Sequence, residues 1–305
     1  MDQLKVVYIA GSGRTGSTIL GQLLDTLDGF FFGGELVDFW QRGMQENRYC
    51  GCGVEASRCQ VWGPIIESFS LRFSAQDLAG MVKARSEARL KDLATWRADD
   101  VVAYPKEFVE RSRELYREIQ RVTGASVVVD SSKFTHYAKV LEAADGIDLH
   151  LVHLVRDPRA VAYSWSKRKQ IPDPTEALMV PRFGAVASTL RWSGRNQAAL
   201  QMRRRLEPRY HLIRYEDYIR QPGKVLAPLF NQLGVVVASQ WPDAANRPTL
   251  PESHAIWGNP SRFGRGPIRL VPDEEWRTAQ PAWTRRLVGA MAAPWLARYG
   301  YSLVA

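Results

Sequence analysis

Apolar and polar residues follow two kinds of pattern along the chain. Short segments rich in β-branched and aromatic residues are almost wholly apolar, as expected of strands buried on both faces. These strand segments are 6–10, 30–32, 126–130, 149–155 and 211–215. Apolar residues have helical spacing in 17–27, 36–47, 159–169, 184–206, the segment after Pro222 and 282–299. The alternation predicts an α/β fold with a doubly wound, mainly parallel sheet flanked by helices.

The block between the second and third strand segments breaks this alternation. Residues 48–64 carry three cysteines and several glycines, and residues 73–123 have the apolar spacing of two or three amphipathic helices. We therefore expect a single domain over residues 1–305, with 48–123 as an insertion or lid within it. Residues 240–275 are rich in Pro, Gly and Arg, which favours an ordered loop over the carboxyl edge of the sheet.

A glycine-rich turn joins the first strand to the first helix. Residues 11–18 have the spacing of a Walker A loop, G-x-x-x-x-G-K-[ST], except that Ser17 stands where the lysine should be. Backbone N–H groups and the helix dipole at such a turn attract phosphate, and Arg14 and Thr18 add a cation and a hydroxyl. Asp130 is the one candidate for a Walker B aspartate, so the pattern gives little support for a magnesium-dependent triphosphatase.

A second segment follows the strand at 149–155. Arg156 stands where this strand leaves the sheet, at the edge where α/β proteins bind ligands. Ser164 lies eight residues later, about two helical turns on, so the two side chains could bracket one phosphate. The other interpretation is that Arg156 and Asp157 form a structural pair that caps the helix.

Composition and charge limit the classes of binding partner that the chain is expected to have. The formal net charge is +9, which favours an anionic ligand. No nucleic-acid-binding motif is recognisable, and we predict no nucleic-acid partner. The basic clusters 167–169 and 203–205 read as solvated helix faces. No leader peptide or membrane-length apolar run is found, and three cysteines fit a reducing compartment, so we expect a cytoplasmic protein without a transmembrane segment.

The chain resembles the PAPS-dependent sulfotransferases, which have a P-loop fold; PAPS is 3′-phosphoadenosine 5′-phosphosulfate. The resemblance rests on three motifs that occur in the family's order. The family's lysine-poor loop R-[ST]-G-[ST]-[ST] is matched by residues 14–18. Its strand-end arginine with a serine eight residues later is matched by Arg156 and Ser164, and its R-Y-E-D motif by residues around Tyr215. The similarity is greatest to bacterial members and to the carbohydrate and tyrosylprotein branches.

The resemblance implies a PAPS site and a transfer of the sulfuryl group to an acceptor hydroxyl. In the family, a later Arg-Lys-Gly segment binds the 3′-phosphate. The resemblance assigns this binding to Ser261 and Arg262, although the local sequence around them differs from that segment. The implied nucleotide-binding residues are Ser12, Gly13, Arg14, Thr15, Gly16, Ser17, Thr18, Arg156, Ser164, Tyr215, Ser261 and Arg262.

The resemblance also implies the catalytic residues, none of which requires a metal. Glu35 follows the second strand and is expected to accept the acceptor's proton, while Lys133 and Arg14 stabilise the charge on the leaving phosphate oxygen. Alternatively, Glu35 caps the next helix and Lys133 is a surface residue. His136 is then the other candidate for the base.

The three motifs assign neither the cysteines nor the acceptor. Cys50, Cys52 and Cys59 form a C-x-C pair with one further cysteine, short of the four ligands and C-x₂₋₄-C spacing of a zinc site. A packed or redox-labile loop is therefore favoured over zinc. A P-loop kinase or a non-catalytic nucleotide-binding protein are the alternative functions. The acceptor is a sugar, lipid, phenol or peptide hydroxyl, and the sequence gives no oligomeric state.

Overall fold

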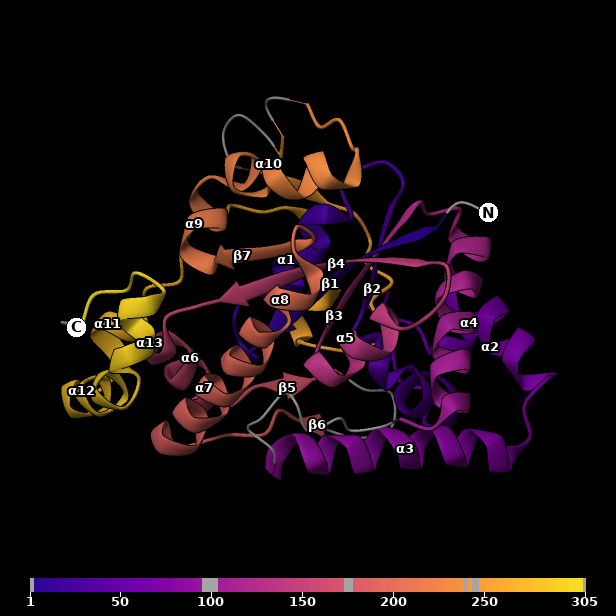
Figure 1. Cartoon of the computed structure of the whole chain (residues 1–305), viewed down its shortest axis with the longest axis horizontal. Helices are drawn as coiled ribbons and strands as arrows, with labels where there is room; N and C mark the ends of the chain where they lie inside the picture. Colours follow the sequence, from indigo (N-terminus) through magenta and orange to yellow (C-terminus); the bar gives the residue numbers. More distant parts are fainter. Residues whose placement is uncertain (1–2, 95–103, 173–177, 239–240, 243–246, 304–305) are drawn as a thin grey trace.

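A central sheet of five parallel strands organises the chain (Figure 1). The computed structural model describes residues 3–94, 104–172, 178–238, 241–242 and 247–303. The strand order is β2-β3-β1-β4-β7, and every neighbouring pair is parallel. The strands are β1 (Leu4–Gly11), β2 (Phe30–Gly34), β3 (Val127–Lys133), β4 (Ile147–Val155) and β7 (Tyr210–Arg214). The predicted α/β fold with a mainly parallel sheet is confirmed.

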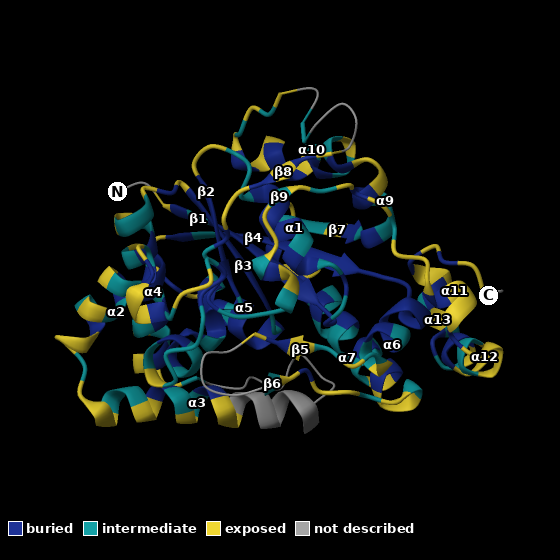
Figure 2. Cartoon of the chain, turned by 180° about the vertical axis from the view of Figure 1, so that it is seen from behind, coloured by how far each residue is buried: buried dark blue, intermediate teal, exposed yellow. Residues whose placement is uncertain are grey.

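The apolar segments form central strands because both of their faces are covered. On β1, Val6 and Tyr8 belong to one hydrophobic cluster, while Val7 and Ile9 belong to another on the opposite face. Figure 2 shows the strands buried between helices. The first cluster is completed by α4 (Lys106–Thr123), α5 (Thr135–Glu142) and the end of α7 (Ala185–Gln201). The second is completed by α1 (Ser17–Leu24), α9 (Tyr215–Arg220) and α10 (Pro222–Leu233).

Shorter elements surround this core. The helices not yet named are α2 (Trp62–Ser70), α3 (Ala75–Ala94), α6 (Pro158–Ser166), α8 (Arg203–Leu206), α11 (Trp276–Ala279), α12 (Ala282–Met291) and α13 (Ala293–Arg298). Two-stranded pairs are formed by β5 (Gln170–Ile171) with β6 (Leu178–Met179) and by β8 (Thr249–Leu250) with β9 (Gly266–Pro267). None of the helices in the described part of the chain is both long and apolar enough to cross a bilayer.

The helical block after β2 packs directly on the sheet. Trp62, Phe69 and Phe108 are buried in the same cluster as Val6 and Tyr8 of β1. This block therefore shares its hydrophobic core with the sheet, while the single domain with an insertion stays a prediction. Residues 95–103 of the predicted insertion lie outside the described residues, and its role as a lid stays a prediction.

Several boundaries differ from the sequence interpretation. The segment 36–47 is not an α-helix but a 3₁₀ turn, η1 (Leu36–Asp38), followed by a π-helix, η2 (Phe39–Gln45). The predicted helix 159–169 ends at Ser166, so Lys169 lies beyond it. β3 runs past the apolar residues to Lys133 because its polar end is buried: the Ser132 hydroxyl accepts a hydrogen bond from Val37 N–H at 3.0 Å.

Candidate active site

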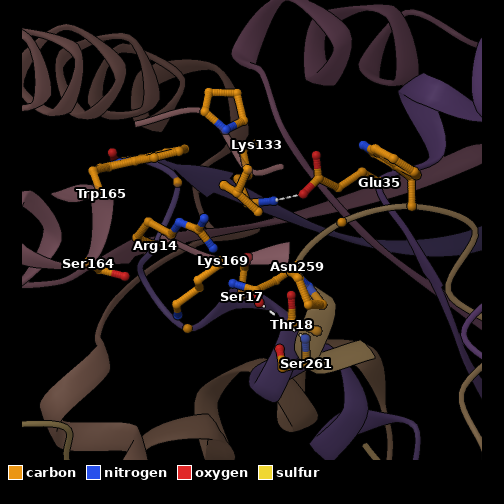
Figure 3. A pocket seen from close by; sticks show the side chains of 18 of the residues that line it. Arg14, Ser17, Thr18, Glu35, Lys133, Ser164, Trp165, Lys169, Asn259 and Ser261 are labelled. Atoms are coloured by element: carbon orange, nitrogen blue, oxygen red, sulfur yellow. Dashed lines mark hydrogen bonds and ion pairs between the residues drawn. The ribbon is translucent and has the colours of Figure 1, made fainter. Parts of the chain in front are cut away.

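A cavity of about 670 Å³ opens at the carboxyl edge of the sheet (Figure 3). The phosphate loop after β1, Glu35 after β2, Lys133 at the end of β3 and Arg156 after β4 all line it. The chain crosses from one side of β1 to the other between β3 and β4, and ligands of α/β sheets bind at such a switch point. Residues more than a hundred positions apart therefore meet in one site.

The phosphate loop is held in a tight curl. Gly16 precedes α1 with a φ of 86°, and a side chain there would come within 2.6 Å of the Tyr215 ring. Thr15 donates its hydroxyl proton to the Ser12 carbonyl at 3.0 Å, so its side chain closes the loop and does not line the cavity. The loop residues that line the cavity are Ser12, Gly13, Arg14, Gly16, Ser17 and Thr18.

Arg14 presents a partly unsatisfied cation to the cavity. Its guanidinium lies over the Trp165 ring at 4.7 Å, and its buried Nε has no hydrogen-bond partner among the described residues. Burial lowers the pKa of Arg14, and the nearby Glu35 carboxylate partly offsets that shift. A buried donor without a partner is costly, so this guanidinium is suited to an anion in the cavity.

Arg156 links the phosphate loop to the end of β4. It donates to the Arg14 carbonyl at 3.2 Å and pairs with the Asp273 carboxylate at 3.1 Å, while its Nε has no partner in the described structure. The helix-capping role falls to another pair, because Asp157 accepts from Arg159 N–H at 2.9 Å. Ser164, on α6, also lines the cavity, so the two predicted phosphate ligands are brought together.

Tyr215 lies beside the phosphate loop at the start of α9. Its ring lies under the Arg156 guanidinium at 4.4 Å, and its hydroxyl accepts from Asp273 N–H at 3.3 Å. Burial is the main cause that raises the pKa of Tyr215. The tyrosine thus forms an aromatic wall of the cavity next to the glycine turn.

Glu35 and Lys133 form an ion pair inside the cavity (Figure 3). The Lys133 ammonium lies 2.5 Å from Glu35 Oε1 and 2.8 Å from the Ser131 carbonyl. Glu35 precedes η1, but its side chain makes no capping hydrogen bond. Lys133 adopts a left-handed φ of 72°, which turns its side chain into the cavity. The geometry agrees with neither alternative interpretation, a capping glutamate or a surface lysine.

Two other candidate residues lie away from the cavity. Asp130 is fully buried beneath it, where Ser132 N–H donates to its carboxylate at 2.7 Å, and burial raises its pKa to about 6. His136 is buried in α5 and does not line the cavity. Of the candidates for the base, only Glu35 reaches the cavity.

The loop between β8 and β9 (the late loop) contributes one of its two predicted residues to the cavity. Ser261 lines the cavity beside Asn259 (Figure 3), whereas Arg262 does not. The Arg262 side chain is fully buried and donates to the Gly258 carbonyl at 3.2 Å and to the Tyr49 carbonyl at 3.1 Å. Arg262 thus fixes the shape of the loop, which does not fit the phosphate-binding role that the sequence suggested.

Sequence reasoning missed much of the positive lining. Lys169 was assigned to a solvated helix face, yet it lies in the cavity, where burial and then the nearby Arg14 lower its pKa. No local pattern indicates this placement, because it depends on where α6 ends. Three acidic residues line the cavity in the described chain, against eight basic ones, which are Arg14, Arg42, Arg85, Lys133, Arg156, Lys169, Arg191 and Arg195. Such a lining favours an anionic ligand.

Comparison with known proteins identifies the family. The model of the sulfotransferase family matches residues 7–239, which include both phosphate motifs and the Glu35–Lys133 pair. The chain belongs to the sulfotransferase family. This confirms the family predicted from the sequence and supports an activity of the sulfotransferase class.

Individual relatives are distant. Carbohydrate sulfotransferase 3 of Mus musculus is 26% identical over 169 residues, which are 52% of this chain and 34% of the relative. The chain therefore matches only about a third of that protein's length. The sulfotransferase domain from the curacin biosynthetic pathway is 18% identical with a TM-score of 0.54, over 99% of both chains. That structural similarity supports the fold.

Proposed function

We propose that the chain transfers the sulfuryl group of PAPS to an acceptor hydroxyl. The observation that carries the proposal is the Glu35–Lys133 pair, which faces a lysine-free phosphate loop across one cavity. A proton acceptor and a cation at a phosphate-binding loop are what in-line sulfuryl transfer requires, since positioning and electrostatics do most of the work in such displacements.

The cavity residues fit the nucleotide. Residues 12–14 and 16–18 would hold the 5′-phosphosulfate through backbone N–H groups at the start of α1, with the Arg14 guanidinium beside them. Arg156 and Ser164 would bind the 3′-phosphate, Tyr215 would lie near the adenine, and Ser261 would contribute from the late loop. The unpartnered Nε atoms of Arg14 and Arg156 support this fit, because each would gain an acceptor.

The chemistry divides between two side chains. When bound, the nucleotide supplies the sulfuryl group and leaves as adenosine 3′,5′-bisphosphate. Glu35 accepts the proton of the acceptor hydroxyl as a general base. The Lys133 ammonium then leaves the Glu35 carboxylate and pairs with the leaving phosphate oxygen. Together with Arg14, it stabilises the negative charge on that oxygen.

A P-loop kinase is the weaker alternative. Ser17 occupies the position of the Walker lysine, and the buried Asp130 does not reach the cavity to hold magnesium. The acceptor class is open among sugar, lipid, phenol and peptide hydroxyls. We place sugars first, since a carbohydrate sulfotransferase is among the relatives.

Calorimetry in magnesium-free buffer tests the nucleotide assignment. We expect adenosine 3′,5′-bisphosphate to bind, adenosine 5′-phosphosulfate to bind more weakly, and added magnesium to leave both affinities unchanged. Binding of ATP that appears only with magnesium, together with no response to the bisphosphate, would favour the kinase.

A further inference from the structure

Four side chains of types that can ligate a metal lie close together outside the cavity. Cys50, Cys52 and Cys59 come from the loop before α2, and His254 comes from the loop after β8. Their ligand atoms all lie within 4.8 Å of one another. His254 Nδ1 lies 3.2 Å from the Cys59 sulfur and 3.9 Å from the Cys50 sulfur. The three thiols are free, so the loop is not closed by a disulfide.

These separations suit a tetrahedral zinc ion. With Zn–S of about 2.3 Å and Zn–N of about 2.0–2.1 Å, neighbouring ligand atoms of a tetrahedral site lie about 3.5–3.8 Å apart. Three soft thiolates together with one imidazole favour zinc over magnesium or calcium, which prefer oxygen ligands. The C-x-C spacing alone was too short a signal, because the fourth ligand, His254, stands 195 residues after Cys59 in the chain.

The surrounding backbone is arranged for thiolates. Each sulfur accepts an N–H from the residue two positions later, the donors being Cys52, Val54 and, at 3.4 Å, Val61. Gly53 has a left-handed φ of 90°, which permits the tight turn that directs the first two of these groups. Donors of this kind stabilise a charged sulfur and orient it, as outer groups do around metal ligands.

The remaining histidine nitrogen also has a partner. His254 Nε2 lies 3.2 Å from the side-chain amide of Gln60, which can accept the ring proton through its oxygen when its amide is rotated. That contact leaves Nδ1 free to bind the metal. The His254 carbonyl accepts from the Trp62 indole at 2.6 Å, which fixes the backbone of this ligand.

We propose that Cys50, Cys52, Cys59 and His254 bind one zinc ion in a closed structural site. Four protein ligands leave no open position for water or substrate, so the ion serves the fold and takes no part in transfer. The ion would link two segments of the chain, namely the loop that contains the three cysteines and the segment that begins at His254.

The segment that begins at His254 also supports the active site. Gly51 N–H donates to the Ala255 carbonyl at 3.0 Å, and Glu35 N–H donates to the Trp257 carbonyl at 3.1 Å. Gly258, which follows Trp257, lines the cavity. The zinc ion would thus fix the wall against which Glu35 is placed. The proposal stands on the four ligands alone and does not depend on the sulfuryl donor.

Metal analysis of the full chain tests this site. Protein purified under reducing conditions with zinc in the growth medium should contain one zinc per chain. After removal of the metal, cobalt(II) titration should give the absorption of a tetrahedral thiolate complex at one equivalent. Cys52→Ser and His254→Ala should each lose most of the bound zinc, while the matched control His211→Ala, on β7, should retain it.

The thiols give an independent measurement. A thiol reagent should react with native protein only slowly until a chelator is added, and the chelated protein should unfold at a lower temperature. Wild-type protein that takes up neither zinc nor cobalt at one equivalent would overturn the proposal, and so would thiol reactivity that the chelator leaves unchanged. If the variants fail to fold, the cobalt titration of wild-type protein decides alone.

Discussion

Two non-glycine residues of the active site adopt left-handed backbone conformations. The φ angles are 67° for Arg14 and 72° for Lys133, and each such residue costs on the order of 1–3 kcal/mol. Both residues direct a cationic side chain into the same cavity. Strain of this kind persists where the surrounding structure fixes it, which agrees with a preorganised anion site.

The role of Glu35 can be separated from a structural one. Glu35→Gln is nearly isosteric but cannot accept a proton, so we expect turnover to fall about 10²–10⁴-fold. The fold and the binding of the nucleotide should be retained, but the unfolding temperature should fall, because the substitution removes the charge partner of the largely buried Lys133 ammonium. Steady-state kinetics and calorimetry on the same preparation check both expectations. Turnover like that of the wild type would remove Glu35 from the mechanism.

Arg156 should discriminate the 3′-phosphate. Arg156→Ala is expected to weaken adenosine 3′,5′-bisphosphate binding by about 2–3 kcal/mol, roughly 30–150-fold, because a charge-assisted contact is lost. Adenosine 5′-phosphosulfate lacks that phosphate and should lose much less. Arg168→Ala is the matched control, since Arg168 is exposed and does not line the cavity. Equal losses for both ligands would assign Arg156 to the support of the phosphate loop.

At the scale of elements, the buried strands and the turns that follow them could be predicted from the sequence. β1, β4 and the first part of β3 are mostly apolar because both faces are covered, and residues at the carboxyl ends of parallel strands must lie at one sheet edge. The sequence therefore predicted that the phosphate loop, Lys133 and Arg156 belong to one site. Lys169 was not, because its position depends on where a helix ends.

The histidine of the proposed zinc site was not predicted from the sequence, for a related reason. His254 meets the cysteines only through the path of a loop that has no periodic pattern. The buried Arg262 does not fit its predicted role, for the same reason. Its guanidinium binds backbone carbonyls of the protein, and the sequence does not distinguish this role from phosphate binding. Irregular segments take their positions from tertiary contacts, which local propensity does not encode.

Asp25, just after α1, makes stability depend on pH. Phe32 N–H donates to its carboxylate at 2.7 Å, but burial dominates and raises its pKa to about 7 from the ordinary 3.8. Between these two values the unfolded chain releases a proton that the folded chain retains, so stability falls as pH rises.

Asp25→Asn cannot ionise and should lack this loss. We expect the unfolding free energy of the wild type, relative to the variant, to decrease from pH 4 to pH 7, the window set by the two pKa values. Urea unfolding at several pH values measures the difference directly. A difference that is constant across the window would mean that Asp25 is ionised in the folded chain.

At the scale of the whole molecule, positive charge is gathered at the site. The chain has a formal net charge of +9, and eight basic residues line the cavity in its described part. We therefore expect the affinity for adenosine 3′,5′-bisphosphate to fall several-fold from low to physiological ionic strength, because salt screens these charges. Adenosine, which has no phosphate, should show almost no salt dependence. Parallel titrations check this, and equal salt dependence of the two ligands would contradict it.

The most direct test of the account is transfer of label from PAPS that carries radioactive sulfur. The protein should be incubated with this donor, without magnesium, and with separate pools of saccharides, lipids, phenols and peptides, with Glu35→Gln as the matched control. The account predicts labelled product in one acceptor pool, formed by the wild type and strongly reduced in the variant. Nucleotide that binds but yields no labelled product in any pool, or product formed equally by both proteins, would contradict it.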